Sequence, residues 1–221
     1  VLISLPPMKP RREPPEPASA RPTVHAISLP TLHGDRTTNA YLLPGTPTAL
    51  IDPGPDTAEA RDALAAACGE LGAPIDTVGQ IVVTHTHTDH CGMTGWLQGR
   101  TGARVLCHPM AAPALAQMSE TLDARLALLL RAASASGVAA DVAEAASRHW
   151  QSRSGAAVTS VPEAALWPAR EGARVRLGGA EWAVLHCPGH ARDHLCLVHR
   201  PSGTLFSGDL LLRHRRVTPW L

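Results

Sequence analysis

The chain has 221 residues, of which 44% are hydrophobic, 3% are aromatic and 18% are charged. This length and apolar content suffice for one domain with a sizeable core. The formal net charge of +1 predicts no strong field and disfavours nucleic acid as a partner. No stretch reaches the roughly 18 apolar residues that a membrane span requires. Composition therefore agrees with a soluble enzyme that acts on a small molecule.

The first 22 residues are predicted to be a disordered leader, and residues 23–221 to be the folded domain. Residues 8–17 are rich in proline and charge, which is unlike a signal peptide. The cysteines are odd in number and show no Cys-x-x-Cys spacing, which indicates free thiols in a reducing compartment. They are Cys68, Cys91, Cys107, Cys187 and Cys196. The sequence therefore predicts a cytoplasmic protein.

Strand-like and helical segments alternate in the manner of a layered α/β fold. The first clear helix is expected at about 57–71, where Asp56 and Glu59 would form a capping box and Gly72 would end the helix. The expected strands lie near 24–29, 39–44, 48–52, 79–84, 103–107, 173–177, 181–186, 194–199 and 204–207.

Residues 109–170 interrupt this alternation and are expected to form a helical insertion. Leucine and alanine recur at helical spacing from Leu122 to Ala133, Gly137 breaks the pattern, and it resumes at 138–150. One interpretation is a lid or substrate-shaping insertion. The other is a helix pair that covers the core or a second copy of the chain, in a homo-oligomer, because apolar stripes usually serve packing.

Three histidines and an aspartate occur within six residues directly after the apolar run Ile81–Val83. In extended chain, residues i and i+2 point the same way, so His85 and His87 can converge on one cation. Asp89 and His90 follow where the chain turns, and they can face a second position. Imidazole nitrogen with carboxylate oxygen suits Zn²⁺ best, with iron or manganese as alternatives. The cluster therefore indicates a metal site.

Two later strand ends supply further ligand candidates. Pro188 and Gly189 break one strand and let His190 leave the sheet, and Gly208 does the same for Asp209. Each residue alone is a weak signal, because single polar residues at strand ends are mostly structural.

In this order, the motifs His85-x-His87-x-Asp89-His90, Pro188-Gly189-His190 and Gly208-Asp209 resemble the metallo-β-lactamase superfamily of dinuclear hydrolases. The segment 39–43 resembles its second strand, and 50–54 resembles its strand and turn with a buried aspartate, here Asp52. The resemblance covers about residues 24–219. It implies an αββα four-layer sandwich.

The resemblance also implies roles for single residues. His85, His87 and His190 would bind the first metal, Asp89 and His90 the second, and Asp209 would bridge both. Asp52 and His194 would support these ligands through hydrogen bonds. The family completes its second site with a later histidine, whereas here only His214 follows Asp209, and a structural role is expected for it. The resemblance therefore implies either a chain truncated at its C-terminus or a second metal with one protein ligand fewer.

The expected function is hydrolysis of a thioester, lactone or other small ester by a hydroxide that two zinc ions hold, with Asp89 and Asp209 fixing the hydroxide. Two alternatives stay open. One is a mononuclear iron-dependent oxygenase of the same fold, such as an enzyme that oxidises persulfides. The other is a catalytically poor scaffold or binding form. Metal content separates the three.

Overall fold

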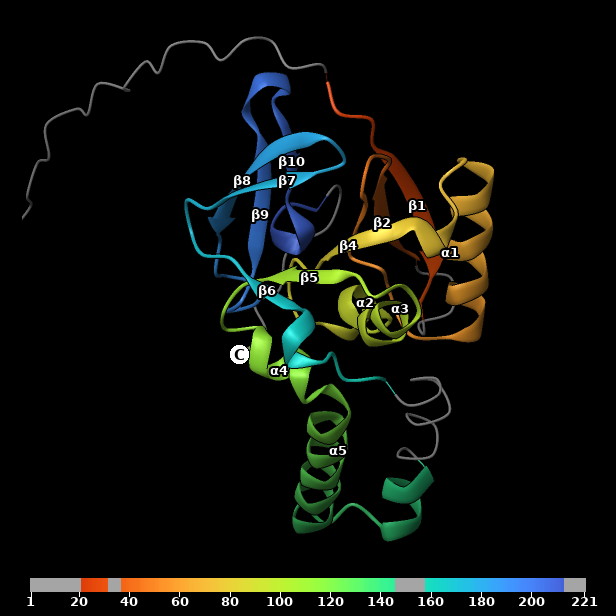
Figure 1. The fold of residues 1–221 in the computed structure, drawn as a ribbon. Coiled ribbons are helices and arrows are strands. Elements are labelled where there is room, and N and C mark those ends of the chain that lie inside the picture. Colours follow the sequence, from red (N-terminus) through yellow and green to blue (C-terminus); the bar gives the residue numbers. More distant parts are fainter. Residues whose placement is uncertain (1–20, 32–36, 146–157, 213–221) are drawn as a thin grey trace, which may run out of the picture.

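The computed structural model describes residues 21–31, 37–145 and 158–212 (Figure 1). The expected leader, apart from residues 21 and 22, and His214 lie outside these ranges. The described strands form two sheets, one of six strands and one of four. This is the mixed α/β architecture that the sequence predicts.

The first sheet has the strand order β1-β2-β3-β4-β5-β6. The pairs β1–β2 and β2–β3 are antiparallel, and the pairs from β3 to β6 are parallel. All four residues of β3 are buried, as expected for a central strand covered on both faces. The bounds are β1 His25–Pro30, β2 Thr37–Leu43, β3 Thr48–Ile51, β4 Val78–Val82, β5 Arg104–Cys107 and β6 Leu166–Pro168.

The second sheet has the order β10-β9-β8-β7, and all of its pairs are antiparallel. Strand β7 shows the alternation of a half-buried strand, since Arg174 and Arg176 are exposed while Val175 and Leu177 are buried. The bounds are β7 Arg174–Leu177, β8 Ala180–His186, β9 Leu195–His199 and β10 Thr204–Phe206.

The labelled α-helices all precede β6 in the sequence. They are α1 Ala58–Glu70, α2 Thr88–Cys91, α3 Thr94–Thr101, α4 Ala112–Ala116 and α5 Met118–Ala135. Short 3-10 helices occur at Ile75–Thr77, Glu163–Ala165, Arg200–Ser202 and Gly208–Leu210. None of the helices in the described ranges combines the length and hydropathy needed to cross a membrane.

The start of α1 differs from the prediction. Thr57 is the N-cap, and its hydroxyl accepts a hydrogen bond from the amide of Ala60 at 3.1 Å. Asp56 lies one residue too early to cap this helix, and its carboxylate instead pairs with Arg61 at 2.6 Å. The expected capping box of Asp56 and Glu59 was therefore wrong, because Thr57 fills the capping position.

Two hydrophobic clusters define the layers. One joins the first sheet to the helices and includes Leu50, Leu64 and Leu97. The other lies between the two sheets and includes Ile51 and Trp182. Neighbouring residues of β3 thus face opposite layers, as the two-residue period of a strand requires. Helix, sheet and sheet are stacked in this order, which confirms the α/β sandwich, although none of the α-helices in the described residues supplies the expected fourth layer on the second sheet.

Helices α4 and α5 follow β5, and α5 extends away from the two sheets (Figure 1). Helical conformation resumes at residues 140–145, after Gly137 with its φ of 78°. The predicted helix and break are therefore present, and the second helix is present as far as residue 145, whereas residues 146–150 of its predicted span lie outside the described ranges. Residues 166–168 were expected to belong to the helical insertion at 109–170. They form strand β6 instead, which pairs with β5 and so belongs to the first sheet.

Candidate metal centre

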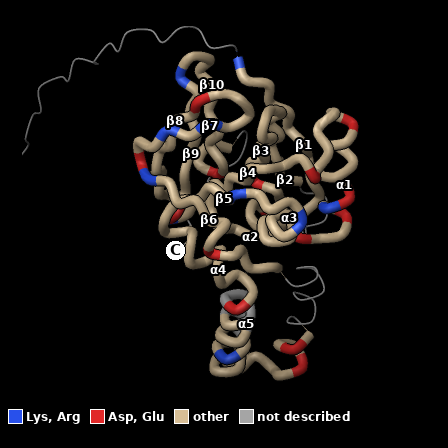
Figure 2. The backbone as a smooth tube through the Cα atoms, viewed as in Figure 1, with Lys and Arg blue, Asp and Glu red and all other residues tan. Residues whose placement is uncertain are grey.

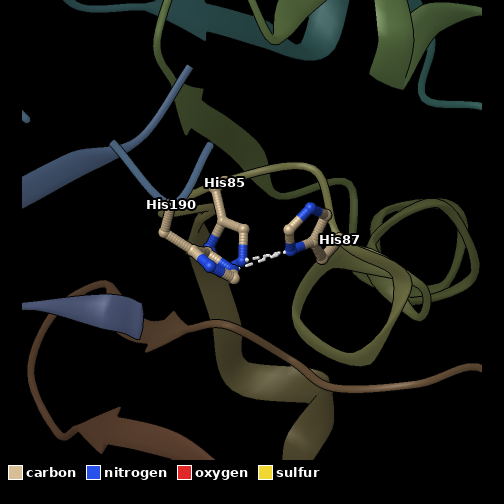
Figure 3. Close-up of side chains that lie close together, drawn as sticks. All are labelled: His85, His87 and His190. Atoms are coloured by element: carbon tan, nitrogen blue, oxygen red, sulfur yellow. Dashed lines mark hydrogen bonds between the residues drawn. The ribbon is translucent and has the colours of Figure 1, made fainter. Parts of the chain in front are cut away.

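Three histidines from two distant loops meet next to the end of β4. Nε2 of His85 lies 3.1 Å from Nδ1 of His87, and Nε2 of His190 lies 2.9 Å from the same atom (Figure 3). His85 is fully buried, and His190 is 7% exposed. The loop after β4 carries His85 and His87, whereas the loop between β8 and β9 carries His190. The packing of the two sheets therefore brings them together.

The hydrogen bonds around Thr84 fix the proton on the His85 ring. The Thr84 hydroxyl donates to Oδ2 of Asp52 at 2.7 Å and lies 3.0 Å from Nδ1 of His85. Since its hydrogen points at the carboxylate, the hydroxyl oxygen accepts from Nδ1–H of His85. Nε2 of His85 is then left with its lone pair, which faces the other two imidazoles.

The three-histidine cluster suits a cation better than it suits hydrogen bonding. Because Nε2 of His85 carries a lone pair, only a hydrogen on Nδ1 of His87 could join these two rings, and a protonated Nδ1 could not also accept from Nε2 of His190. Burial lowers the pKa of His85 and His87, which keeps both rings neutral and able to bind metal. Three converging imidazole nitrogens are a typical zinc ligand set. These residues therefore fit a metal ion.

A second group of candidate ligands adjoins the first. Nε2 of His90 lies 3.3 Å from Oδ1 of Asp209 and 3.8 Å from Oδ2 of Asp89. The other oxygen of Asp209 lies 3.6 Å from Nε2 of His190. Ligand atoms of His85, His90 and Asp209 all lie within 4.8 Å of one another. Asp209 thus stands between the two groups, whereas the side chain of Asp89 is 49% exposed at the rim.

The charges in this second group also favour a cation. Burial alone would lower the pKa of His90, but its hydrogen bonds to Asp209 and Asp52 raise that pKa well above its usual value. Burial opposes ionisation of Asp209, yet the hydrogen bond to His90 lowers its pKa. Between these carboxylates the protein therefore stabilises positive charge, and a metal ion would supply it.

Asp52 supports both groups from the end of β3. Its Oδ1 accepts from the amide of Thr84 at 2.8 Å, and its Oδ2 accepts from Nδ1 of His90 at 3.0 Å. Asp52 has a φ of 51°, a conformation that aspartate tolerates better than most residues. Because Nδ1–H of His90 points at Asp52, Nε2 of His90 is directed toward Asp209. Such outer hydrogen bonds orient metal-binding imidazoles.

His194 contacts the cluster from one side. Its ring stacks on that of His85 with centroids 5.0 Å apart, and its Nε2 accepts from the amide of Asp209 at 3.2 Å. Burial lowers the pKa of His194 to about 4. Gly208, with a φ of 46°, packs so closely that a Cβ there would lie 2.6 Å from Nε2 of His194. His194 therefore holds the backbone that carries Asp209, as a supporting residue would.

The structure brings together all of the candidate residues, namely His85, His87, Asp89, His90, His190, Asp209, Asp52 and His194. It also adds one residue that sequence reasoning missed. Oδ2 of Asp193, which is 7% exposed, accepts from the amide of Thr86 at 3.0 Å. His108, which follows β5, and His186, at the end of β8, stack with centroids 3.9 Å apart.

Comparison with known proteins identifies the family. The sequence model of the metallo-β-lactamase superfamily matches residues 33–221. The chain is 30% identical over 199 residues to the probable metallo-hydrolase YqjP of Bacillus subtilis (strain 168), covering 90% of this chain and 60% of that protein. It is 38% identical over 53 residues to the atrochrysone carboxyl ACP thioesterase AgnL7 of Paecilomyces divaricatus, covering 24% of this chain and 17% of that protein.

Among solved structures, the metallo-β-lactamase family protein TTHA1429 of Thermus thermophilus superposes with a TM-score of 0.70 at 28% sequence identity. The match covers 90% of this chain and 62% of that one. The chain thus spans about three fifths of the length of both YqjP and TTHA1429. With the family match extending over residues 33–221, this chain belongs to the metallo-β-lactamase superfamily.

Proposed function

We propose that this chain is a metal-dependent hydrolase that binds two zinc ions and acts on a thioester, lactone or other small ester. The observation that carries the proposal is the convergence of Nε2 of His85, Nδ1 of His87 and Nε2 of His190. These three residues would hold the first ion. Asp89, His90 and Asp209 would hold the second, with Asp209 shared between both.

When bound, the zinc ions supply Lewis acidity and lower the pKa of a coordinated water. The chain's own residues do the positioning. Asp52 directs His90, and Thr84 directs His85, so that Nε2 of each ring faces the other candidate ligands. Asp89 and Asp209 place two carboxylates beside that position, where they can balance cation charge and hold a proton of the attacking water. This chemistry requires no nucleophile from the protein.

Two findings support an uncharged or weakly charged ester over a nucleic acid as substrate. Acidic and basic residues are interspersed along the described chain (Figure 2), without a large region of one sign. A relative of part of this chain is named a thioesterase, which favours thioesters within the proposed class. The five free cysteines support the proposal that the protein works in the cytoplasm, where thiols stay reduced.

The test is a panel of thioester, lactone and phosphodiester substrates assayed on zinc-reconstituted protein. We expect hydrolysis of a thioester or lactone that a chelator abolishes and added zinc restores. Metal analysis by mass spectrometry, on the same samples, should give about two zinc ions per chain. One iron per chain with consumption of oxygen would instead support an oxygenase, and protein without metal or turnover would support a binding form.

A further inference from the structure

Asp193 connects the two loops that carry the three-histidine cluster. It lies in the loop between β8 and β9, three residues after His190, and its side chain is 7% exposed. Its Oδ2 accepts a hydrogen bond of 3.0 Å from the backbone amide of Thr86. Thr86 is the residue between His85 and His87. One carboxylate therefore contacts the short segment on which two candidate ligands depend.

The hydrogen bond between Thr86 and Asp193 continues a pairing of two chain segments that begins with Thr84 and Leu195. The amide of Leu195 donates to the carbonyl of Thr84 at 2.8 Å, and the amide of Thr86 donates to Asp193. The segments 84–86 and 193–195 thus run side by side, the first beyond the end of β4 and the second at the start of β9. In the second contact a side-chain oxygen takes the place that a backbone carbonyl occupies in a sheet. A substitution can therefore remove this contact, whereas it could not remove a backbone pair.

This contact has a direct geometric consequence for the histidines. Rotation of the peptide between His85 and Thr86, or of the peptide between Thr86 and His87, would change the directions of the two imidazoles that flank Thr86. The hydrogen bond from the partly buried Thr86 amide to a carboxylate is charge-assisted and therefore stronger than a bond to a neutral acceptor, so it resists this rotation. Asp52 holds the amide of Thr84 in the same way, at 2.8 Å. The loop is thus held by two buried carboxylates, one from each sheet.

We propose that Asp193 is a positioning residue that keeps His85 and His87 aligned with His190 for metal binding. The inference rests on the proposed metal-dependent function and adds a residue to it. Asp193 acts through the Thr86 amide on the loop after β4, and it joins that loop to the segment that carries His190.

The test compares Asp193→Ala with Asp193→Asn. The asparagine side chain keeps an oxygen that can accept from the Thr86 amide, whereas alanine does not. We expect Asp193→Ala to weaken zinc binding by about 10- to 100-fold and to alter the visible spectrum of bound Co²⁺, which reports ligand number and geometry. Asp193→Asn should keep affinity within a few fold of the wild type and keep its Co²⁺ spectrum. Asp62→Ala, which removes the same charge from an exposed position of α1, is the matched control and should bind zinc normally.

The outcomes separate this inference from the proposed function. Wild-type affinity in Asp193→Ala would overturn the inference alone, and equal losses in the alanine and asparagine variants would show that charge and not the hydrogen bond matters, which also overturns it. Wild-type protein that binds neither zinc nor Co²⁺ would overturn the proposed function together with the inference. Amide hydrogen exchange in metal-free wild-type protein provides a check without any variant. The Thr86 amide should exchange slowly, and rapid exchange would contradict the contact.

Discussion

Oδ1 of Asp209 lies 3.3 Å from Nε2 of His90, although His90 lies in α2, after β4 of the first sheet, and Asp209 follows β10 of the second sheet. The other oxygen of the same carboxylate lies 3.6 Å from Nε2 of His190. Each oxygen of one side chain thus serves a different group of candidate ligands. Packing of the two sheets creates this arrangement, and the proposed two-ion site depends on it.

His87→Ala should abolish tight zinc binding at the three-histidine cluster and reduce hydrolysis by at least about 100-fold, because His87 provides the central nitrogen of that cluster. Mass spectrometry of the dialysed protein gives the zinc content. The control is His25→Ala, in β1, which should leave the zinc content unchanged. Unchanged zinc in the His87→Ala protein would remove His87 from the first site.

Asp52→Ala should destabilise the metal-free protein by about 3 kcal/mol, because it leaves the Thr84 amide and Nδ1–H of His90 buried without their acceptor. Urea denaturation measures the change. Asp76→Ala, which removes an exposed carboxylate paired with Arg100, is the comparison and should have a much smaller effect. Equal effects of the two substitutions would contradict the supporting role of Asp52.

Gly208→Ala should lower both stability and metal content. The residue has a φ of 46°, and a Cβ there would lie 2.6 Å from Nε2 of His194 and 2.8 Å from Oγ1 of Thr84. The new methyl group must therefore displace the backbone of Asp209, with an expected cost of about 1–3 kcal/mol from overpacking in addition to backbone strain. Gly203→Ala isolates the strain, since Gly203 has a φ of 68° and no atom within 4 Å of the added Cβ. It should keep its metal, and a loss as large as that of Gly208→Ala would argue against the close contact.

Metal-free protein should lose stability as the pH falls from 6.5 toward 4. Burial lowers the pKa of His194 to about 4, whereas in the unfolded chain it is about 6.5. Between these values the unfolded state binds a proton that the folded state does not, so falling pH favours unfolding by up to about 1.4 kcal/mol per pH unit for this group. The pKa values of His85 and His87 are lowered in the same direction, while that of His90 is raised and opposes them.

The measurement is the urea midpoint at several pH values for the wild type and for His194→Gln, whose side-chain oxygen can still accept from the amide of Asp209. The variant should show a weaker pH dependence in this range. Identical slopes for the two proteins would show that His194 does not titrate as its burial requires.

Most of the fold could be predicted because period-two patterns and glycine or proline breaks mark its longer strands. All nine predicted strands are present, for example β8 at Ala180–His186 against a predicted 181–186. Strand β6 was missed because Leu166–Pro168 is too short to show a period and ends in proline. Helix α2, at Thr88–Cys91, was read as a turn because one helical turn has no stripe of its own.

The candidate site also contains residues that the sequence predicts and one that it does not. His85 and His87 could be predicted because their spacing within one segment fixes their directions, and His190 and Asp209 because their motifs resemble those of a known family. Asp193 could not be predicted, since its partner is 107 residues away and is a backbone amide. An amide is the same at every residue except proline, so such a contact leaves no trace in the identity of its partner.

The most direct test of the metal centre is anomalous X-ray scattering at the zinc edge from crystals of zinc-loaded protein. We expect a peak about 2.0–2.1 Å from Nε2 of His85, Nδ1 of His87 and Nε2 of His190, with a second peak beside His90 and Asp209. A map without a peak at the three-histidine cluster, or with the ring of His190 turned away from the other two, would contradict the proposed metal-dependent chemistry.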